Sequence, residues 1–232
     1  LLFIFVKIKS LFYKYKSQSN EASIIESLCE KYGIKKNYLE IGFSPWEFNC
    51  SSLANNNKGV IIDADKTNTK IGKWLLKKAK IICEFIDLDN IDKLIKDINF
   101  PINIISLDID GNDYYIMERL FKLNPSMIVC EYNPAFHLRP ITIPYKKDFD
   151  RTKEHKEWVY YGCSLKAWEI IMKKNDFSLV SISSSGVNAF FVKNNLIKDK
   201  NEILNPDKDF VDYDWPYNQT HEDIWSKMNY KN

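Results

Sequence analysis

The sequence predicts a single α/β domain built on a mostly parallel β-sheet, with helices on both faces of the sheet. Two patterns lead to this prediction. Short apolar runs alternate with segments of helical spacing through the middle of the chain, as in βαβ units. Two β-rich runs near the end are joined by a serine- and glycine-containing turn, which predicts an antiparallel hairpin. With 232 residues, of which 45% are hydrophobic, the chain is long enough for one sizeable core.

Short runs rich in Ile, Val and Leu predict five parallel strands, because strands buried on both faces are apolar throughout. These strands are expected at residues 38–41, 59–63, 81–85, 102–108 and 127–131. The closing hairpin is expected from residues 177–182 and 188–193. A lead-in helix at 21–32 and helices at 68–79, 91–98 and 113–120 carry apolar residues at helical spacing.

The segment after the fifth strand is predicted to be a long ordered loop that ends near Tyr161. Its prolines, which exclude a long helix, are Pro134, Pro140 and Pro144. A loop of this length is usually functional. Ser164 is a suitable N-cap for a following helix that ends at Lys174.

The chain divides into an N-terminal extension with the lead-in helix (1–36), the main domain (37–195) and a tail expected to pack on it (196–232). The first six residues are apolar, and Lys7 and Lys9 interrupt them far short of a membrane span. The start resembles a truncated one. Residues 1–16 form either a helix or strand packed on the domain or a basic amphipathic surface anchor. The tail carries Trp215, Tyr217 and Trp225, which wrap the domain or cover the site.

The net charge and the cysteines indicate which partners and which cellular compartment to expect. The formal net charge is +2, so no overall field favours nucleic acid or an anionic membrane as a partner. The five cysteines are odd in number and widely separated, which favours a reducing, cytoplasmic location. The oligomeric state is left open.

A ligand site is expected beyond the carboxyl ends of the parallel strands, where the strand order reverses. The first strand ends with Glu40 and Gly42, which are candidate cofactor-binding residues. Asp63 ends the second strand and is placed to accept ribose hydroxyls, whereas Asp65 is the alternative as a helix cap. Asp87 follows the third strand. It either flanks an adenine or, as we favour, is a helix N-terminal acid.

The densest group of acids follows the fourth and fifth strands, and these acids should meet at one rim of the sheet. Asp108, Asp110, Glu131 and Asn133 are candidate ligands of a divalent cation such as Mg²⁺, which would lower the pKa of a substrate oxygen. Without a metal, Asp108 or Asp110 can orient the substrate or act as a general base. In the rival interpretation, Asp113 starts a helix, Asp110 and Gly111 form a turn, and one buried acid binds loop amides.

The long loop supplies a second kind of candidate base. His155, and with less support His137, is a natural base for a hydroxyl nucleophile if it reaches the site. Tyr145, Tyr160 and Tyr161 either line the pocket or pack the loop onto the sheet.

Several of these runs together carry a family resemblance. They are Ser106-Leu107-Asp108-Ile109-Asp110-Gly111-Asn112-Asp113-Tyr114, Glu131-Tyr132-Asn133, Tyr160-Tyr161-Gly162-Cys163-Ser164-Leu165 and Asn188-Ala189-Phe190-Phe191-Val192. As a set they resemble the FkbM-like methyltransferases, especially bacterial members associated with surface-polysaccharide genes. The resemblance covers residues 38–193.

The resemblance implies the Rossmann-like sheet of class I methyltransferases, which is also the plan given by five parallel strands and a closing hairpin. It implies an S-adenosylmethionine-dependent enzyme that methylates an oxygen, or less often a nitrogen, of a sugar or a related small metabolite. The cofactor would lie against Gly42, Asp63 and Asp108. The methyl group would pass in line from sulfur to acceptor, which requires positioning more than acid–base power.

The chain departs from these relatives in the first loop. They typically show Glu-x-Gly-x-Gly or Gly-x-Gly-Asp-Gly there, whereas this chain has Glu40-Ile41-Gly42-Phe43-Ser44-Pro45. The alternative is therefore a non-catalytic domain that keeps the fold for binding or assembly. The closing hairpin argues against a third possibility, a nucleotide-binding oxidoreductase.

Overall fold

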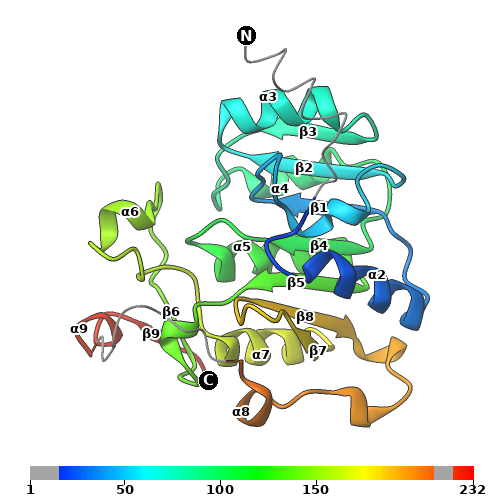
Figure 1. The fold of residues 1–232 in the computed structure, drawn as a ribbon. Coiled ribbons are helices and arrows are strands. Elements are labelled where there is room, and N and C mark those ends of the chain that lie inside the picture. The colour runs from blue at the N-terminus through cyan, green and yellow to red at the C-terminus, as the bar shows by residue number, and fades with distance from the viewer. Residues whose placement is uncertain (1–15, 212–221) are drawn as a thin grey trace.

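The computed structural model describes residues 16–211 and 222–232, and its centre is one seven-stranded sheet (Figure 1). The strands are β1 (Tyr38–Ile41), β2 (Gly59–Asp63), β3 (Ala79–Cys83), β4 (Ile104–Leu107), β5 (Met127–Glu131), β7 (Phe177–Ile182) and β8 (Asn188–Lys193). Their order across the sheet is β3-β2-β1-β4-β5-β8-β7. The order reverses between β1 and β4, which opens a crevice at the carboxyl ends of these strands.

The strand directions confirm the predicted sheet. Strands β1 to β5 are parallel, β8 is antiparallel to β5, and β7 is antiparallel to β8. Five of the seven predicted spans match the observed bounds. β3 lies two residues earlier than predicted, because Ala79 already pairs with Gly59 of β2. β4 is shorter than predicted and pairs with β1 only from Ile104 to Leu107.

Helices cover both faces of the sheet, as predicted (Figure 1). The longer ones are α2 (Glu21–Tyr32), α3 (Lys66–Leu75), α4 (Ile91–Lys96), α5 (Asp113–Leu120) and α7 (Leu165–Lys174). The short ones are α6 (Arg151–Glu154), α8 (Pro206–Asp209) and α9 (Glu222–Trp225), with 3-10 turns η1 (Asn49–Ser52), η2 (Phe121–Leu123), η3 (Pro134–Phe136), η4 (Asn194–Leu196) and η5 (Lys200–Glu202).

Successive side chains of each strand point to opposite faces of the sheet, so a hydrophobic core forms on each face. On one face of the sheet, side chains of α4, α5 and α7 pack against strand residues such as Leu39 and Ile105. On the other face, α2, η1 and the end of α3 pack against the alternate residues, such as Tyr38 and Ile104. Because successive strand side chains point to opposite faces, a strand buried on both faces must be apolar throughout.

Two of the predicted helix caps are present. The Ser164 hydroxyl accepts a hydrogen bond from Ala167 N at 3.0 Å and starts α7. The Asp65 carboxylate accepts one from Asn68 N at 2.7 Å, so α3 begins at Lys66, two residues earlier than predicted. A satisfied backbone donor in the first turn fixes where a helix begins.

The long loop after β5 is ordered and carries its own elements. It contains η3, α6 and β6 (Ile141–Thr142), and β6 pairs antiparallel with β9 (Asn229–Tyr230) from the C-terminal segment. Figure 1 shows α6, α9 and this small sheet beyond one end of the large sheet. A third apolar cluster, which includes Phe149, Tyr161 and Trp225, joins the loop to that segment.

Some predictions about the ends lie outside the described residues. They concern the possible surface anchor at 1–16, apart from Lys16 itself, and the tail residues Trp215 and Tyr217. The division of the chain at residues 36 and 195 stays a prediction. In the described part of the chain, no helix combines the length and apolar character needed to cross a membrane.

Candidate active site

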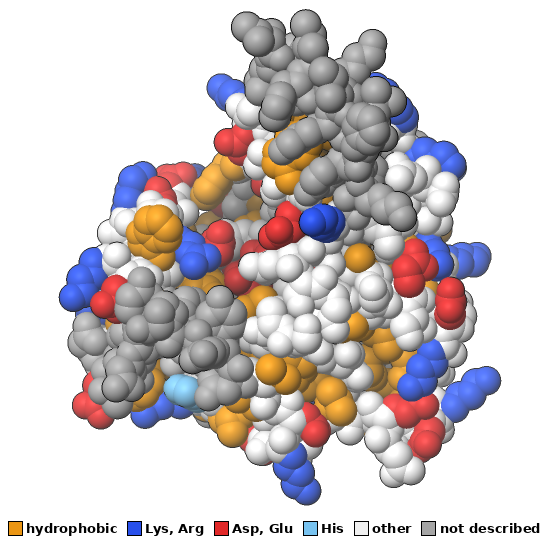
Figure 2. All heavy atoms as spheres, viewed as in Figure 1, with side chains coloured by type: hydrophobic (Ala, Val, Ile, Leu, Met, Phe, Trp, Pro, Cys, Tyr) orange, Lys and Arg blue, Asp and Glu red, His pale blue; other side chains and the backbone are white. Residues whose placement is uncertain are grey.

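A cavity of about 460 Å³ opens at the carboxyl ends of β1, β2, β4 and β5. Gly42, Asp63, Asp108 and Glu131 all line it, so the sheet edge selected from the sequence is the edge that carries the cavity. On the face drawn in Figure 2, acidic side chains gather in the hollow beside the α6 segment. The volume of this cavity is in the range of small-molecule and cofactor sites.

Gly42 allows the ends of β1 and β4 to lie against each other. Its φ is +84°, and a Cβ built on it would lie 1.5 Å from the backbone oxygen of Asp108. Gly42 N donates to Ile62 O at 3.0 Å, and Asp108 N donates to Ile41 O at 2.9 Å. The parallel ladder therefore continues past the strands to the floor of the cavity, and only glycine fits at this position.

Asp63 organises the first loop. Its carboxylate accepts hydrogen bonds from Phe43 N at 2.9 Å and from Asp65 N at 2.7 Å. Burial raises the pKa of this carboxyl above its usual value, although both backbone donors act in the opposite direction. Each carboxylate oxygen keeps a second lone pair, so Asp63 can still accept a ligand hydroxyl from the cavity that it lines.

The first loop adopts its shape without a second glycine. Ser44 is not among the described non-glycine residues with positive φ, so its side chain is compatible with the local backbone. Asn68 Nδ2 donates to Phe43 O at 3.0 Å, and Glu47 N donates to Ser44 O at 3.1 Å. The loop is therefore held by ordinary hydrogen bonds on both sides of Phe43.

Glu40 lies at the base of the cavity and is only 1% exposed. Its carboxylate accepts hydrogen bonds from Asn49 N at 3.1 Å, Cys50 N at 3.0 Å and Ser106 Oγ at 3.1 Å. Burial raises its pKa to about 7 against the effect of these donors. Glu40 thus ties η1 to β1 and β4, and this is the role that the structure shows for it.

Asp87 has the structural role that the sequence favoured, not the adenine-flanking one. Its carboxylate accepts from Asp89 N at 2.9 Å and Asn90 N at 3.0 Å just before α4. It does not line the cavity. The wall after β3 is instead formed by Glu84, Phe85 and Ile86, because β3 ends at Cys83, two residues earlier than predicted.

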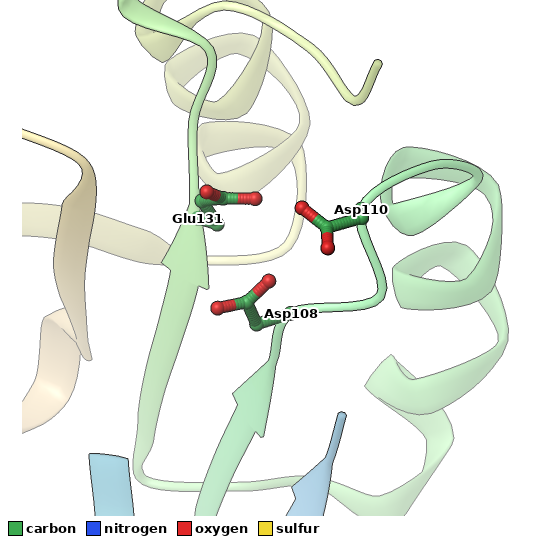
Figure 3. A group of neighbouring side chains, drawn as sticks. All are labelled: Asp108, Asp110 and Glu131. Atoms are coloured by element: carbon green, nitrogen blue, oxygen red, sulfur yellow. The ribbon is translucent and has the colours of Figure 1, made fainter. Parts of the chain in front are cut away.

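Three of the four predicted metal ligands come together. Carboxylate oxygens of Asp108, Asp110 and Glu131 all lie within 4.8 Å of one another, and Figure 3 shows the three groups converging. Burial raises the pKa of Asp108 and that of Glu131 well above their usual values, and the charge of Asp110 raises both further. Like charges held this close together favour a shared proton or a bound cation.

Arg151 supplies a positive charge to this cluster. Its guanidinium forms an ion pair with Asp110 and lies 4.1 Å from the centre of the Tyr161 ring. Its Nε donates to the backbone oxygen of Trp158 at 3.2 Å. Arg151 begins α6, so this one side chain connects the acidic cluster to the long loop.

Part of the rival interpretation of this region is also correct. Asp113 starts α5 and is buried, and its carboxylate accepts from Ile109 N and Gly111 N, both at 2.8 Å. Burial raises its pKa to about 6. Asp110 has a φ of +55° and lies in the turn expected there, in the left-handed region. Asp113 is therefore the acid that binds loop amides, and it leaves Asp108 and Asp110 to the cavity.

Asn133 does not join the acidic cluster. Its side chain is fully buried, donates to Val159 O at 2.8 Å and Tyr161 O at 3.0 Å, and accepts from Ala135 N at 3.0 Å. It does not line the cavity. The amide of Asn133 is used to hold the long loop, so the structure gives no support to Asn133 as the fourth metal ligand.

The structure also places His155 away from the predicted catalytic position. Its Nδ1 accepts from Glu157 N at 3.2 Å, and the residue follows α6 without lining the cavity. His137 lies beside Phe210, with ring centres 6.2 Å apart. Of the loop tyrosines, Tyr161 contacts the cluster, with its hydroxyl 3.5 Å from Glu131 Oε1.

Among the cavity residues that were not predicted from the sequence are Phe85, Phe149 and Arg151. The aromatic pair had no distinguishing pattern. Arg151 did have one, because the chain contains arginine only at positions 119, 139 and 151 among its many lysines. An arginine in a functional loop is a better candidate for carboxylate binding than lysine, and the long loop contains two, Arg139 and Arg151.

Comparison with known proteins gives the fold. No family model matches the sequence, and no curated protein does. Among solved structures, an O-methyltransferase from Bacillus cereus in complex with SAH is 17% identical, with a TM-score of 0.50 over 82% of this chain and 88% of that one. A putative caffeoyl-CoA O-methyltransferase from Staphylococcus aureus is 14% identical, with a TM-score of 0.51 over 81% and 91%.

This chain has the class I methyltransferase fold. The plantazolicin methyltransferase BamL, solved with a triazolic desmethylPZN analog and SAH, is similar at 12% identity, with a TM-score of 0.50 over 76% of this chain and 86% of that one. The predicted Rossmann-like plan is thereby confirmed. At these identities the likeness concerns the methyltransferase fold alone, and the FkbM-like resemblance stays a prediction.

Proposed function

We propose that this methyltransferase-fold protein is an S-adenosylmethionine-dependent O-methyltransferase that acts on a sugar or related small metabolite in glycan biosynthesis, as the FkbM-like resemblance implies. The observation that carries the proposal is the cavity, which runs from Gly42 and Asp63 to the carboxylates of Asp108 and Glu131. A cytoplasmic location is part of the same proposal. It is supported by the described cysteines, all of which are free.

The residues present fit the cofactor. Asp63 can accept the ribose hydroxyls, and the backbone of Gly42 and Phe43 forms the wall where the methionine part would rest. Glu84, Phe85 and Ile86 form the wall available to the adenine. When bound, the cofactor supplies a methyl group activated on a sulfonium sulfur.

The acidic cluster can accept the proton of the acceptor. As the acceptor oxygen forms its bond to the methyl carbon and the sulfur–carbon bond breaks, the hydroxyl proton must leave. Asp108 and Glu131 have raised pKa values and face each other at the end of the cavity. Asp108 lines the cavity beside Glu131, so its ionised carboxylate is the proposed general base, with Asp110 orienting the acceptor.

The sequence also predicts the ion that these carboxylates would hold, a divalent cation such as Mg²⁺. Asp108, Asp110 and Glu131 provide oxygen ligands of the right kind, but Arg151 is paired with Asp110. We propose that the cation competes with Arg151 for this cluster. If it binds, it would lower the pKa of the acceptor hydroxyl and reduce the demand on Asp108 as a base.

The alternative, a non-catalytic domain with a degraded first loop, has less support. Phe43 lines the cavity without filling it, and Trp46 does not line it. Ser44 requires no strained backbone, so the missing glycine is no sign of a damaged site.

Calorimetry with S-adenosylmethionine and S-adenosylhomocysteine (SAH), with and without Mg²⁺, tests the proposal. We expect micromolar binding that weakens at least about tenfold in Asp63→Ala, roughly the worth of one charge-assisted hydrogen bond. Asp65→Ala is the matched control, because Asp65 caps α3 and does not line the cavity. Absence of binding in the wild-type protein, or equal losses in both variants, would refute the cofactor assignment.

A further inference from the structure

A second cavity of about 640 Å³ adjoins the first one. The two share the residues Phe85, Ile109, Asp110, Phe149 and Arg151. They therefore form one cleft with two lobes. The first lobe lies over Gly42 and Asp63, and the second lobe lies under the loop that contains α6.

The second lobe combines exposed aromatic rings with polar groups. Phe85 and Trp158, both among its lining residues, are 41% and 53% exposed. Its polar lining residues are Asp110, Asp148, Asp150, Arg151, Thr152 and Lys153. Lys153 pairs with Asp150 at 2.8 Å, and Arg151 pairs with Asp110, so much of the charge is already balanced.

Trp158 is held in an unfavourable backbone conformation. Its φ is +58°, in the left-handed region that a bulky residue rarely adopts. Trp158 N donates to His155 O at 3.0 Å, and its backbone oxygen accepts from Arg151 Nε at 3.2 Å. Such strain tends to occur at functional sites, and here it accompanies a large ring that is left half exposed beside a cavity.

We infer that the second lobe binds the methyl acceptor as a neutral, polyhydroxylated ring, with one face of the ring packed on the Trp158 indole. The C–H groups on one face of a pyranose match an aromatic surface, while its hydroxyls donate to carboxylates such as Asp148. Because Arg151 and Lys153 are paired with aspartates, the lining carries little net charge and favours a neutral acceptor over an ion of either sign.

The shared residues explain how a ring held there would meet the chemistry. Asp110 and Arg151 lie at the junction of the two lobes, and Asp110 is in the cluster with Asp108. A hydroxyl directed from the second lobe towards that junction approaches the proposed general base. This inference rests on the proposed function, because it gives the place and the stacking residue for the acceptor of the same site.

Saturation-transfer NMR on SAH-loaded protein with methyl glycosides of glucose, galactose, mannose and rhamnose tests it. We expect at least one glycoside to bind at millimolar concentration, with the strongest saturation on one ring face. Trp158→Gly should abolish this binding and raise the urea midpoint, because glycine relieves the left-handed strain. Trp158→Phe should retain measurable binding.

The control is Tyr230→Ala, which removes an aromatic ring that is 60% exposed on β9 and lines neither cavity. SAH affinity distinguishes a failure of the acceptor assignment from a failure of the proposed function. If SAH binds but no glycoside does, or if Trp158→Gly binds glycosides as the wild type does, the inference is overturned and the proposed function stands. If SAH fails to bind, the proposed function and the acceptor role both fall.

Discussion

Replacing Gly42 by alanine should separate the ends of β1 and β4. The new Cβ would lie 1.5 Å from the backbone oxygen of Asp108, and real Cβ atoms stay at least 3.0 Å from such a neighbour. The two backbones would have to part by about 1.5 Å, since neither atom belongs to a flexible side chain. We expect a loss of roughly 3–5 kcal/mol in the free energy of unfolding, which combines left-handed strain with the clash.

Gly33→Ala separates these two contributions. Gly33 ends α2 with a φ of +65°, and a Cβ there would meet nothing within 4 Å. It should cost only the left-handed strain, about 1 kcal/mol. Urea unfolding measures both losses, and calorimetry with SAH should show weaker binding in Gly42→Ala alone. Equal losses of stability in the two variants would refute the argument that close contact with Asp108 requires glycine.

Two other predictions concern charge. The pKa of Glu40 is about 7 in the folded protein against 4.5 in its ordinary state, so the folded state holds a proton that the unfolded state releases. Stability should therefore fall by about 3 kcal/mol as pH rises from 4.5 to 7, and urea titrations of Glu40→Gln should lack this part of the slope. Arg151→Met should bind Mn²⁺ at least about tenfold more tightly by calorimetry, because it removes a competing cation from Asp110. Lys153→Met is the control on the same helix, and an unchanged Mn²⁺ affinity in Arg151→Met would contradict the competition.

The sheet could be predicted from the sequence because its strands are buried on both faces. Strands such as β2 and β5 are continuous apolar runs between polar segments, and their bounds match the prediction. β3 was harder to place, since only Ile81 is buried in it. The strand at the opposite edge of the sheet, β7, was placed correctly because the turn that joins it to β8 marks its end, and β3 has no such hairpin partner.

The site was predictable where residues follow strands and unpredictable where they come from the loop. Gly42, Asp63, Asp108 and Glu131 lie at the carboxyl ends of strands, and topology alone brings such positions together. The loop residues depend on backbone turns that local sequence does not determine. One example is the left-handed backbone at Trp158, which could not be expected because a bulky residue rarely adopts it.

The first loop shows why a missing motif residue is weak grounds for a lost function. Glycine is required where φ is positive or where another backbone approaches, and both conditions hold at Gly42. Ser44 has no positive φ, so it does not need to be glycine. The backbone of its neighbour Phe43 is held by hydrogen bonds to Asp63 and Asn68. Because Asp63 already holds that backbone, removing its carboxylate should loosen the loop as well as remove a ligand for ribose. The predicted loss of SAH affinity in Asp63→Ala therefore has two causes, and Asp63→Asn, which keeps one acceptor oxygen, should lose less.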